Sequence, residues 1–163
     1  MTRRFFEQHR ADVDFASAVS AILIPQSYVS LDYILQRLGI LTEVTYPVTS
    51  VTIKQTRLIE NQMGTFTYRN IKVDLYSGFS ISNYLGIPFA QASLAKALFD
   101  YLYLMPFTGR VRLARYDLAE DLRLNLYDVS KENRVEFEAY IGASQSRKME
   151  LILNNLRKTI WRP

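Results

Sequence analysis

Residues 92–104, with the sequence ASLAKALFDYLYL, are apolar around nearly the whole circumference of a predicted helix. A helix of this kind is stable only where other elements cover it on more than one side. We therefore expect it to lie buried between a sheet and further helices. Its charged residues, Lys96 and Asp100, have i, i+4 spacing, and we expect them to pair along its one exposed edge.

Residues 45–90 supply the strands of that sheet. The stretch 45–58 is rich in Val, Thr and Ile and has no helical period, which predicts a strand. A turn at residues 61–64 precedes one or two further strands in residues 64–76, where Phe66 and Tyr68 fall on one face. Residues 77–90 continue as a short strand or an irregular crossing. The pattern predicts a small antiparallel or mixed sheet of three or four strands.

Helical patterns flank the sheet on both sides in the sequence. Before it, we expect one helix over residues 12–23 that stops at Pro25, and a second that Ser30 caps and Gly39 ends. After the buried helix, a further helix is lined by Leu118, Leu122 and Leu126, the next runs from a Ser130 cap to Gly142, and the last presents Met149, Ile152, Leu153, Leu156 and Ile160.

The order of these elements predicts an α+β fold in a single domain spanning residues 1–163. We expect a helical entry over residues 1–43, the sheet over 44–86, and a C-terminal helical bundle over 90–160 that packs on the sheet. The chain has no cysteine, which excludes disulfides and cysteine-based zinc sites. The N-terminal residues 1–15 contain no apolar stretch, so we expect no secretory signal, and no apolar run reaches the about 20 residues that a membrane span requires. We therefore expect a soluble, cytoplasmic protein without a membrane partner.

The sequence offers little for catalysis. His9 is the only histidine, so a histidine triad or a multi-histidine metal site cannot form within one chain. Ser93 and Lys96 match the S-x-x-K spacing of a serine nucleophile and lysine base, but the K-T-G and S-D-N elements are absent. A simpler interpretation makes Ser93 a helix cap and Lys96 a solvated side chain. No phosphate-binding glycine motif is present. We predict no catalytic residue, no metal ligand and no cofactor.

The formal charge of +4 is compatible with an ordinary surface or with a surface that binds nucleic acid or an acidic partner. Basic residues of the sheet lie among Tyr and Thr, which would suit contacts with phosphates and bases. The competing interpretation is that they protect a sheet edge or pair with Glu60 or Asp74. The candidate contact residues are Lys54, Arg57, Arg69 and Lys72 of the sheet, Arg110 and Arg112 of a loop, and Arg147 and Lys148 near the C-terminus.

Four segments follow one another at short spacing: SYVSLDYILQRLGILTE at 27–43, VTSVTIKQTR at 48–57, GTFTYRNIK at 64–72 and ASLAKALFDYLYL at 92–104. This succession resembles the antitoxin domain of the AbiEi family, the regulator half of bacterial type IV toxin–antitoxin and abortive-infection operons, which serve in phage defence. A looser match at residues 121–141 extends the resemblance, which covers residues 15–156 in all.

The resemblance implies a non-enzymatic antitoxin that counteracts a nucleotidyltransferase-type toxin and is linked to transcriptional regulation of its operon. Family members typically begin with a winged helix that binds promoter DNA. The segment before Phe15 is far shorter, so we expect an antitoxin domain without that part. Relatives usually begin the buried helix with S-P-E-K-A, and SLAKA at residues 93–97 initiates a helix less well. The alternative function is a regulatory module that binds DNA or RNA through a basic face.

Overall fold

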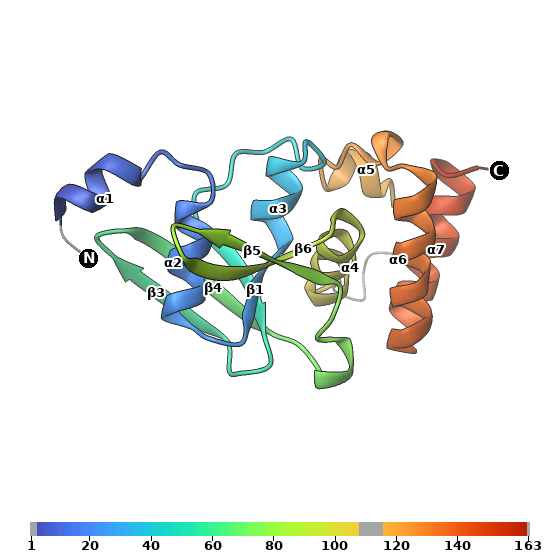
Figure 1. Ribbon diagram of the computed structural model, residues 1–163. Helices are drawn as coiled ribbons and strands as arrows, with labels where there is room; N and C mark the ends of the chain where they lie inside the picture. Colours follow the sequence, from blue (N-terminus) through green and yellow to red (C-terminus); the bar gives the residue numbers. More distant parts are fainter. Residues whose placement is uncertain (1–2, 108–115, 163) are drawn as a thin grey trace.

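In the part of the chain that the structure describes, six strands form one mixed sheet that has helices on both faces (Figure 1). The computed structural model describes residues 3–107 and 116–162. The strands are β1 (Ser27–Val29), β2 (Val48–Thr52), β3 (Arg57–Asn61), β4 (Gly64–Asn70), β5 (Phe79–Tyr84) and β6 (Ile87–Ala92). The helices are α1 (Arg3–His9), α2 (Phe15–Leu23), α3 (Leu31–Arg37), α4 (Leu94–Leu104), α5 (Leu118–Asp121), α6 (Lys131–Ser144) and α7 (Arg147–Thr159), with 3₁₀ turns η1 (Val73–Leu75) and η3 (Leu126–Asp128).

The sheet has the strand order β3-β4-β2-β1-β6-β5. β1 runs antiparallel to β2 and parallel to β6, and β2 runs parallel to β4. The two outer pairs, β3–β4 and β5–β6, are antiparallel. The α+β class and the mixed character of the sheet are confirmed. The prediction of three or four strands is wrong, because both β1 and the β5–β6 hairpin belong to the same sheet.

β1 occupies the middle of the sheet although it lies between α2 and α3 in the sequence. Its three residues are all buried, and they pair with β2 on one side and β6 on the other. The strict order of helices first and sheet afterwards is therefore wrong. The reason is physical: three fully buried residues have no alternation between polar and apolar faces from which a strand can be recognised.

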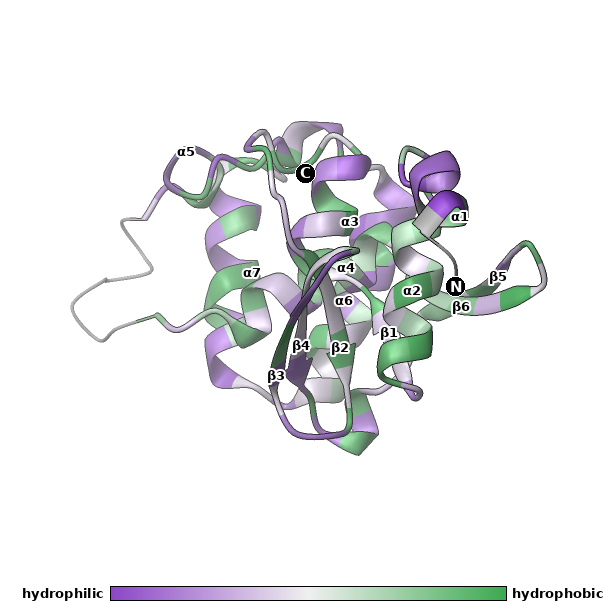
Figure 2. Ribbon diagram, turned by 90° about the vertical axis from the view of Figure 1, so that its left-hand side faces the viewer, coloured by the Kyte–Doolittle hydropathy of each residue, from purple (hydrophilic) through white to green (hydrophobic). Residues whose placement is uncertain are grey.

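The two faces of the sheet carry different helices. α2 packs on one face, where Ser20 contacts Ser50 of β2 and accepts a hydrogen bond at its carbonyl from the Tyr68 hydroxyl at 2.9 Å. Phe66 and Tyr68 share this face and are buried, as predicted. α3 and α4 cover the opposite face, with α6 and α7 packed beyond α4. Figure 2 shows α2 on one side of the sheet and α7 on the other. α4 is thus enclosed as expected.

Several helix boundaries differ from the predicted ones. α2 begins at Phe15, and a separate helix, α1, precedes it. The predicted helix lined by Leu118, Leu122 and Leu126 is instead α5 followed by η3, since Arg123 has a φ of 52° and Leu124 forms a β-bridge with Leu41. α6 is capped by Ser130, as predicted, and ends at Ser144. α7 buries its predicted stripe except for Ile160, which is half-buried just after the helix ends. Within the described residues, no helix is long and apolar enough to cross a membrane.

Candidate functional site

The charged pair of α4 lies inside the protein. Lys96 and Asp100 are both 0% exposed, and the Lys96 Nζ is 2.8 Å from the Asp100 Oδ1. The predicted i, i+4 pair is confirmed, but its placement on an exposed edge is wrong. Tyr28 from β1 donates a hydrogen bond to Asp100 Oδ2 at 2.9 Å, and Ser30 donates to the same atom at 2.8 Å. Ser30 therefore lies at the N-terminus of α3, as expected. Its hydroxyl donates to Asp100 of α4, however, and does not cap α3.

Lys96 is held by further contacts. Its ammonium donates to the Leu75 carbonyl of η1 at 2.8 Å and lies 4.8 Å and 5.3 Å from the ring centroids of Phe99 and Tyr140. Burial lowers the pKa of Lys96 and raises the pKa of Asp100, and the attraction between the two groups opposes both shifts. The pair joins α4 to β1, η1 and α6. Because neither side chain has exposed surface, the pair connects elements within the core and is not a binding site on the surface.

Ser93 caps α4, as predicted. Its hydroxyl accepts a hydrogen bond from the Lys96 backbone amide at 3.1 Å and donates to Glu136 Oε1 at 2.6 Å. Tyr140 donates to the same carboxylate at 2.7 Å, and burial followed by this contact raises its pKa to about 12. The serine hydroxyl and the lysine ammonium of the S-x-x-K spacing are thus each engaged by other partners.

Three candidate contact residues of the sheet lie at one end of it. β2 and β4 are parallel, so Lys54 after β2 and Lys72 after β4 emerge together, and Arg57 begins β3 beside them. Asn70 donates from its side-chain amide to the carbonyls of Ile53 and Lys54, at 3.1 Å and 2.8 Å, and so fixes the β2–β3 connection against the end of β4. All three cations are exposed.

Arg147 is exposed at the start of α7, and the α6–α7 turn lies at the same lower end of the molecule as η1 and the β2–β3 connection (Figure 1). We call Lys54, Arg57, Lys72 and Arg147 the basic end. The upper end, around α5 and η3, carries the exposed carboxylates of Asp117, Glu120, Asp121 and Asp128 together with the exposed cations Arg123 and Lys131. The basic end is therefore a local group of exposed cations, beside which Asp74 of η1 is also exposed.

Two other candidates serve the fold. Arg69 lies on the opposite face of the sheet from Arg57, and it donates to the Leu104 carbonyl at 3.0 Å. Lys148 donates to the carbonyl of Tyr103, and to that of Met105 at 3.1 Å. Both cations therefore satisfy carbonyl groups at the C-terminus of α4, where positive charge is favourable. Arg110 and Arg112 lie outside the described residues.

His9 also has a structural position. Its Nδ1 is 3.1 Å from Asp12 Oδ2 and 3.0 Å from the Tyr84 hydroxyl of β5, and the same hydroxyl donates to Asp12. This group fastens the α1–α2 connection to the end of β5. Among the residues that the structure describes, no three His, Asp or Glu side chains gather closely enough to hold a metal ion.

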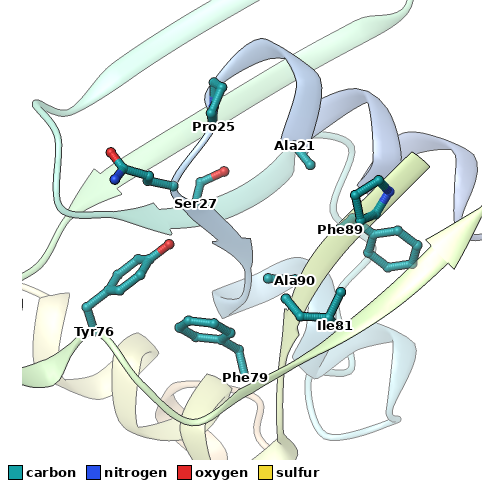
Figure 3. A pocket seen from close by; sticks show the side chains of 10 residues that line it. Ala21, Pro25, Ser27, Tyr76, Phe79, Ile81, Phe89 and Ala90 are labelled. Atoms are coloured by element: carbon teal, nitrogen blue, oxygen red, sulfur yellow. The ribbon is translucent and has the colours of Figure 1, made fainter. Parts of the chain in front are cut away.

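A pocket of about 360 Å³ lies where the end of α2 and the start of β1 meet the β5–β6 hairpin (Figure 3). Figure 3 shows the Ser27 and Tyr76 hydroxyls at one side of it and the apolar side chains of Phe79, Ile81 and Phe89 at the other. The local sequence pattern does not predict this pocket, because residues 77–90 have the pattern of a short strand or an irregular crossing. Recognition of the two-residue turn at Leu85 and Gly86 would have predicted the hairpin.

A smaller hollow of about 220 Å³ lies on the α3–α4 side and is lined in part by Asp32, Arg69 and Tyr101. Burial raises the pKa of Asp32, and the nearby Arg69 guanidinium opposes that shift.

Comparisons of the chain with protein-family models, with curated proteins and with solved structures found no match.

Proposed function

We propose that this chain is a non-enzymatic antitoxin domain that counteracts a nucleotidyltransferase-type toxin and is linked to regulation of its operon. The observation that carries the proposal is the joint position of the four segments that resemble the AbiEi family. They contain β1 and α3, then β2, then β4, then α4, and these elements pack on one another. Asp100 of the last segment accepts hydrogen bonds from Tyr28 and Ser30 of the first.

The basic end supports a mode of action by binding. Its four exposed cations come from three segments of the sequence, and a surface of this kind attracts a phosphate backbone or an acidic protein surface. An antitoxin that binds the nucleic-acid target of its toxin, or the toxin itself, needs no catalytic group. The engaged hydroxyl of Ser93 and the buried ammonium of Lys96 agree with such a role.

The test is growth of cells that express the toxin encoded beside this gene, with and without this chain. We expect the chain to restore growth. A variant with alanine at the four positions of the basic end should lose rescue. The matched control replaces four exposed cations outside the basic end and changes the net charge equally; these are Arg10, Lys131, Lys158 and Arg162. Rescue by this control and not by the first variant assigns the activity to the basic end.

Two other results would change the proposal. Equal rescue by both variants would keep the antitoxin role and remove the basic end from it. Absence of rescue by the unaltered chain, with both proteins soluble and expressed, would contradict the antitoxin role itself.

The four exposed cations of the basic end favour a second candidate function, a regulatory module that binds DNA or RNA. Binding of a labelled duplex and of a single strand, followed by fluorescence anisotropy, tests it directly. The logarithm of the association constant should fall with the logarithm of salt concentration, with a slope of about −0.9 for each duplex phosphate neutralised. Alanine at the basic end should make that slope shallower. Affinity that does not change with salt would contradict this function.

A further inference from the structure

β5 is an outer strand of the sheet with an open side. Residues 80–83 are exposed one after another, although successive side chains of a strand point to opposite faces. Both faces of the strand are therefore accessible there, and Ile81 is 66% exposed. Figure 2 shows the β5–β6 hairpin extending away from the body of the molecule.

The register of the hairpin identifies the backbone groups that face outward. Asn83 lies opposite Pro88, which has no N–H group, so this pair belongs to the non-hydrogen-bonded set. Hydrogen-bonded and non-hydrogen-bonded pairs alternate in an antiparallel ladder, which places Ile81 and Phe79 in the same set as Asn83. The turn agrees, because a two-residue turn with φ values of 48° at Leu85 and 85° at Gly86 closes on a hydrogen-bonded pair. Phe79, Ile81 and Asn83 therefore direct N–H and C=O groups away from β6.

β5 lacks the usual protection of an outer strand. Proteins commonly place charged side chains or proline on such strands, which discourages pairing with another chain. The opposite outer strand, β3, carries Arg57 and Glu60. β5 has the sequence FSISNY and carries neither a charge nor a proline. The two edges of this sheet thus differ in their capacity to accept a further strand.

We propose that β5 pairs with β5 of a second copy of this chain, antiparallel and about a two-fold axis at Ile81. In this register Ile81 faces its own copy, and Phe79 faces Asn83 of the other molecule. Every outward-facing residue then meets an outward-facing residue, and each pair exchanges two hydrogen bonds. The axis carries an exposed apolar side chain and no charge, so the strand is complementary to itself.

The pocket beside β5 fits this arrangement. Phe79 and Ile81 line it and lie on one face of the strand (Figure 3). Cross-strand neighbours in an antiparallel pair share a face, so Ile81 of the second copy would stand next to Ile81 at the pocket wall. The dimer thereby covers apolar surface that a single copy leaves in water.

Cysteine cross-linking tests the pairing, since the chain has no cysteine of its own. The variant Ile81→Cys places two thiols across the axis, where a Cα separation of about 5.5 Å permits a disulfide. The control is Leu58→Cys on β3, whose native side chain is 62% exposed. At equal protein concentration we expect Ile81→Cys to form the covalent dimer about tenfold faster or more, because pairing raises the effective concentration of the thiols.

Sedimentation of the unmodified protein provides an independent measurement. We expect a dimer at about 100 μM, and a monomer for Ile81→Lys, which places two like charges on the axis. Circular dichroism should be unchanged in Ile81→Lys, because the side chain is exposed. A monomeric unmodified protein, or equal cross-linking of the two cysteine variants, would overturn the proposal and leave β5 open to a strand of another protein.

Discussion

Lys96 and Asp100 lie one turn apart on α4, fully inside the protein, with 2.8 Å between Nζ and Oδ1. Desolvation of two charges is expensive, and their attraction compensates only where other polar groups complete the shell. Here the shell includes the hydroxyls of Tyr28 and Ser30 and the carbonyl of Leu75. The pair thus connects elements on three sides of α4, and its integrity depends on all of them.

The first prediction concerns this pair. Asp100→Asn or Lys96→Met leaves one buried charge without its partner, so each should lower the free energy of unfolding by about 3–5 kcal/mol. The double variant Lys96→Met with Asp100→Asn should lose less than the sum of the single losses, because no uncompensated charge remains. Urea unfolding of the unaltered protein, the two single variants and the double variant measures the coupling free energy between the two side chains. Single losses below about 1 kcal/mol would contradict the description of a buried, mutually dependent pair.

The second prediction concerns Gly78, which has a φ of +77° and stands against α6 and α4. A Cβ there would overlap the Tyr140 hydroxyl and would lie 2.8 Å from Lys96 Cγ. Gly39 has a nearly equal φ of +73° and open space around its Cβ position. Gly39→Ala should therefore lower stability by about 1–2 kcal/mol through the backbone alone.

Gly78→Ala should lower stability by about 1–3 kcal/mol more than Gly39→Ala, because the methyl group must displace packed atoms. Thermal and urea unfolding of both variants measure the difference. Addition of Tyr140→Phe to Gly78→Ala should recover part of the loss, since the phenol oxygen is the closest obstacle. Equal losses for the two glycines would mean that α6 does not pack on the segment before β5 as described.

The third prediction separates two neighbouring cations. Lys148 is partly buried, donates to two carbonyls at the end of α4, and lies 5.5 Å from the Phe107 ring centroid. Lys148→Met should lower stability by about 1–3 kcal/mol, because charged hydrogen bonds to those carbonyls are lost. Arg147→Met should change stability by no more than about 0.5 kcal/mol, since the side chain is exposed.

The same two variants should rank in the opposite order in binding. Arg147 belongs to the basic end, so its replacement should weaken binding to a polyanion and reduce the salt dependence. Lys148 already engages the carbonyls of Tyr103 and Met105, and its replacement should leave binding by the folded protein unchanged. Urea denaturation should rank Lys148→Met as the more damaging variant, and fluorescence anisotropy with a polyanion should rank Arg147→Met as the more damaging one. Both measurements are made on the same preparations.

The fourth prediction concerns alkaline pH. Burial raises the pKa of many tyrosines, to about 12 for Tyr84, Tyr101 and Tyr140. In the unfolded chain these phenols ionise near their ordinary pKa of about 10, whereas in the folded protein they remain neutral. The contribution of these raised pKa values to the free energy of unfolding is therefore fully present below about pH 10. It is lost as the pH rises through the folded-state pKa values.

Phenolate absorbance during alkaline titration measures this effect. We expect a delayed, broad transition in the folded protein and a single transition near pH 10 in urea. Tyr140→Phe should remove part of the delayed absorbance. One shared midpoint near pH 10 in the folded protein would contradict the burial described.

Local sequence patterns were sufficient for α4, which is apolar on nearly all sides, and for α6, which Ser130 caps. They were also sufficient for α7 and for the faces of β4, which have a clear period. They failed for β1, where three buried residues show no period. They also failed for the environment of Lys96. A charged residue on a helix is assigned to solvent by default, and only the positions of Tyr28, Leu75 and Tyr140 reverse that assignment.

The candidate contact residues show the same limit. Lys54 and Lys72 are brought together by parallel pairing of β2 with β4, which no local pattern specifies. Arg69 and Lys148 are also basic residues, and residue type alone does not separate them from Lys54 and Lys72. Both donate hydrogen bonds to carbonyl groups at the end of α4. Residue type identified the cations, and only the folded structure shows which of them already donate hydrogen bonds to carbonyl groups.

The hydrogen bonds to Asp100 have a consequence for the order in which the chain folds during synthesis. Tyr28 and Ser30 precede their acceptor by 72 and 70 residues, and β1 acquires its parallel neighbour only when β6 has been made. Tyr140, which covers Lys96, emerges from the ribosome later still. A nascent chain that has reached the end of α4 therefore still has its charged pair open to water. We therefore expect the core to close as one late event, after both α6 and α7 have been made.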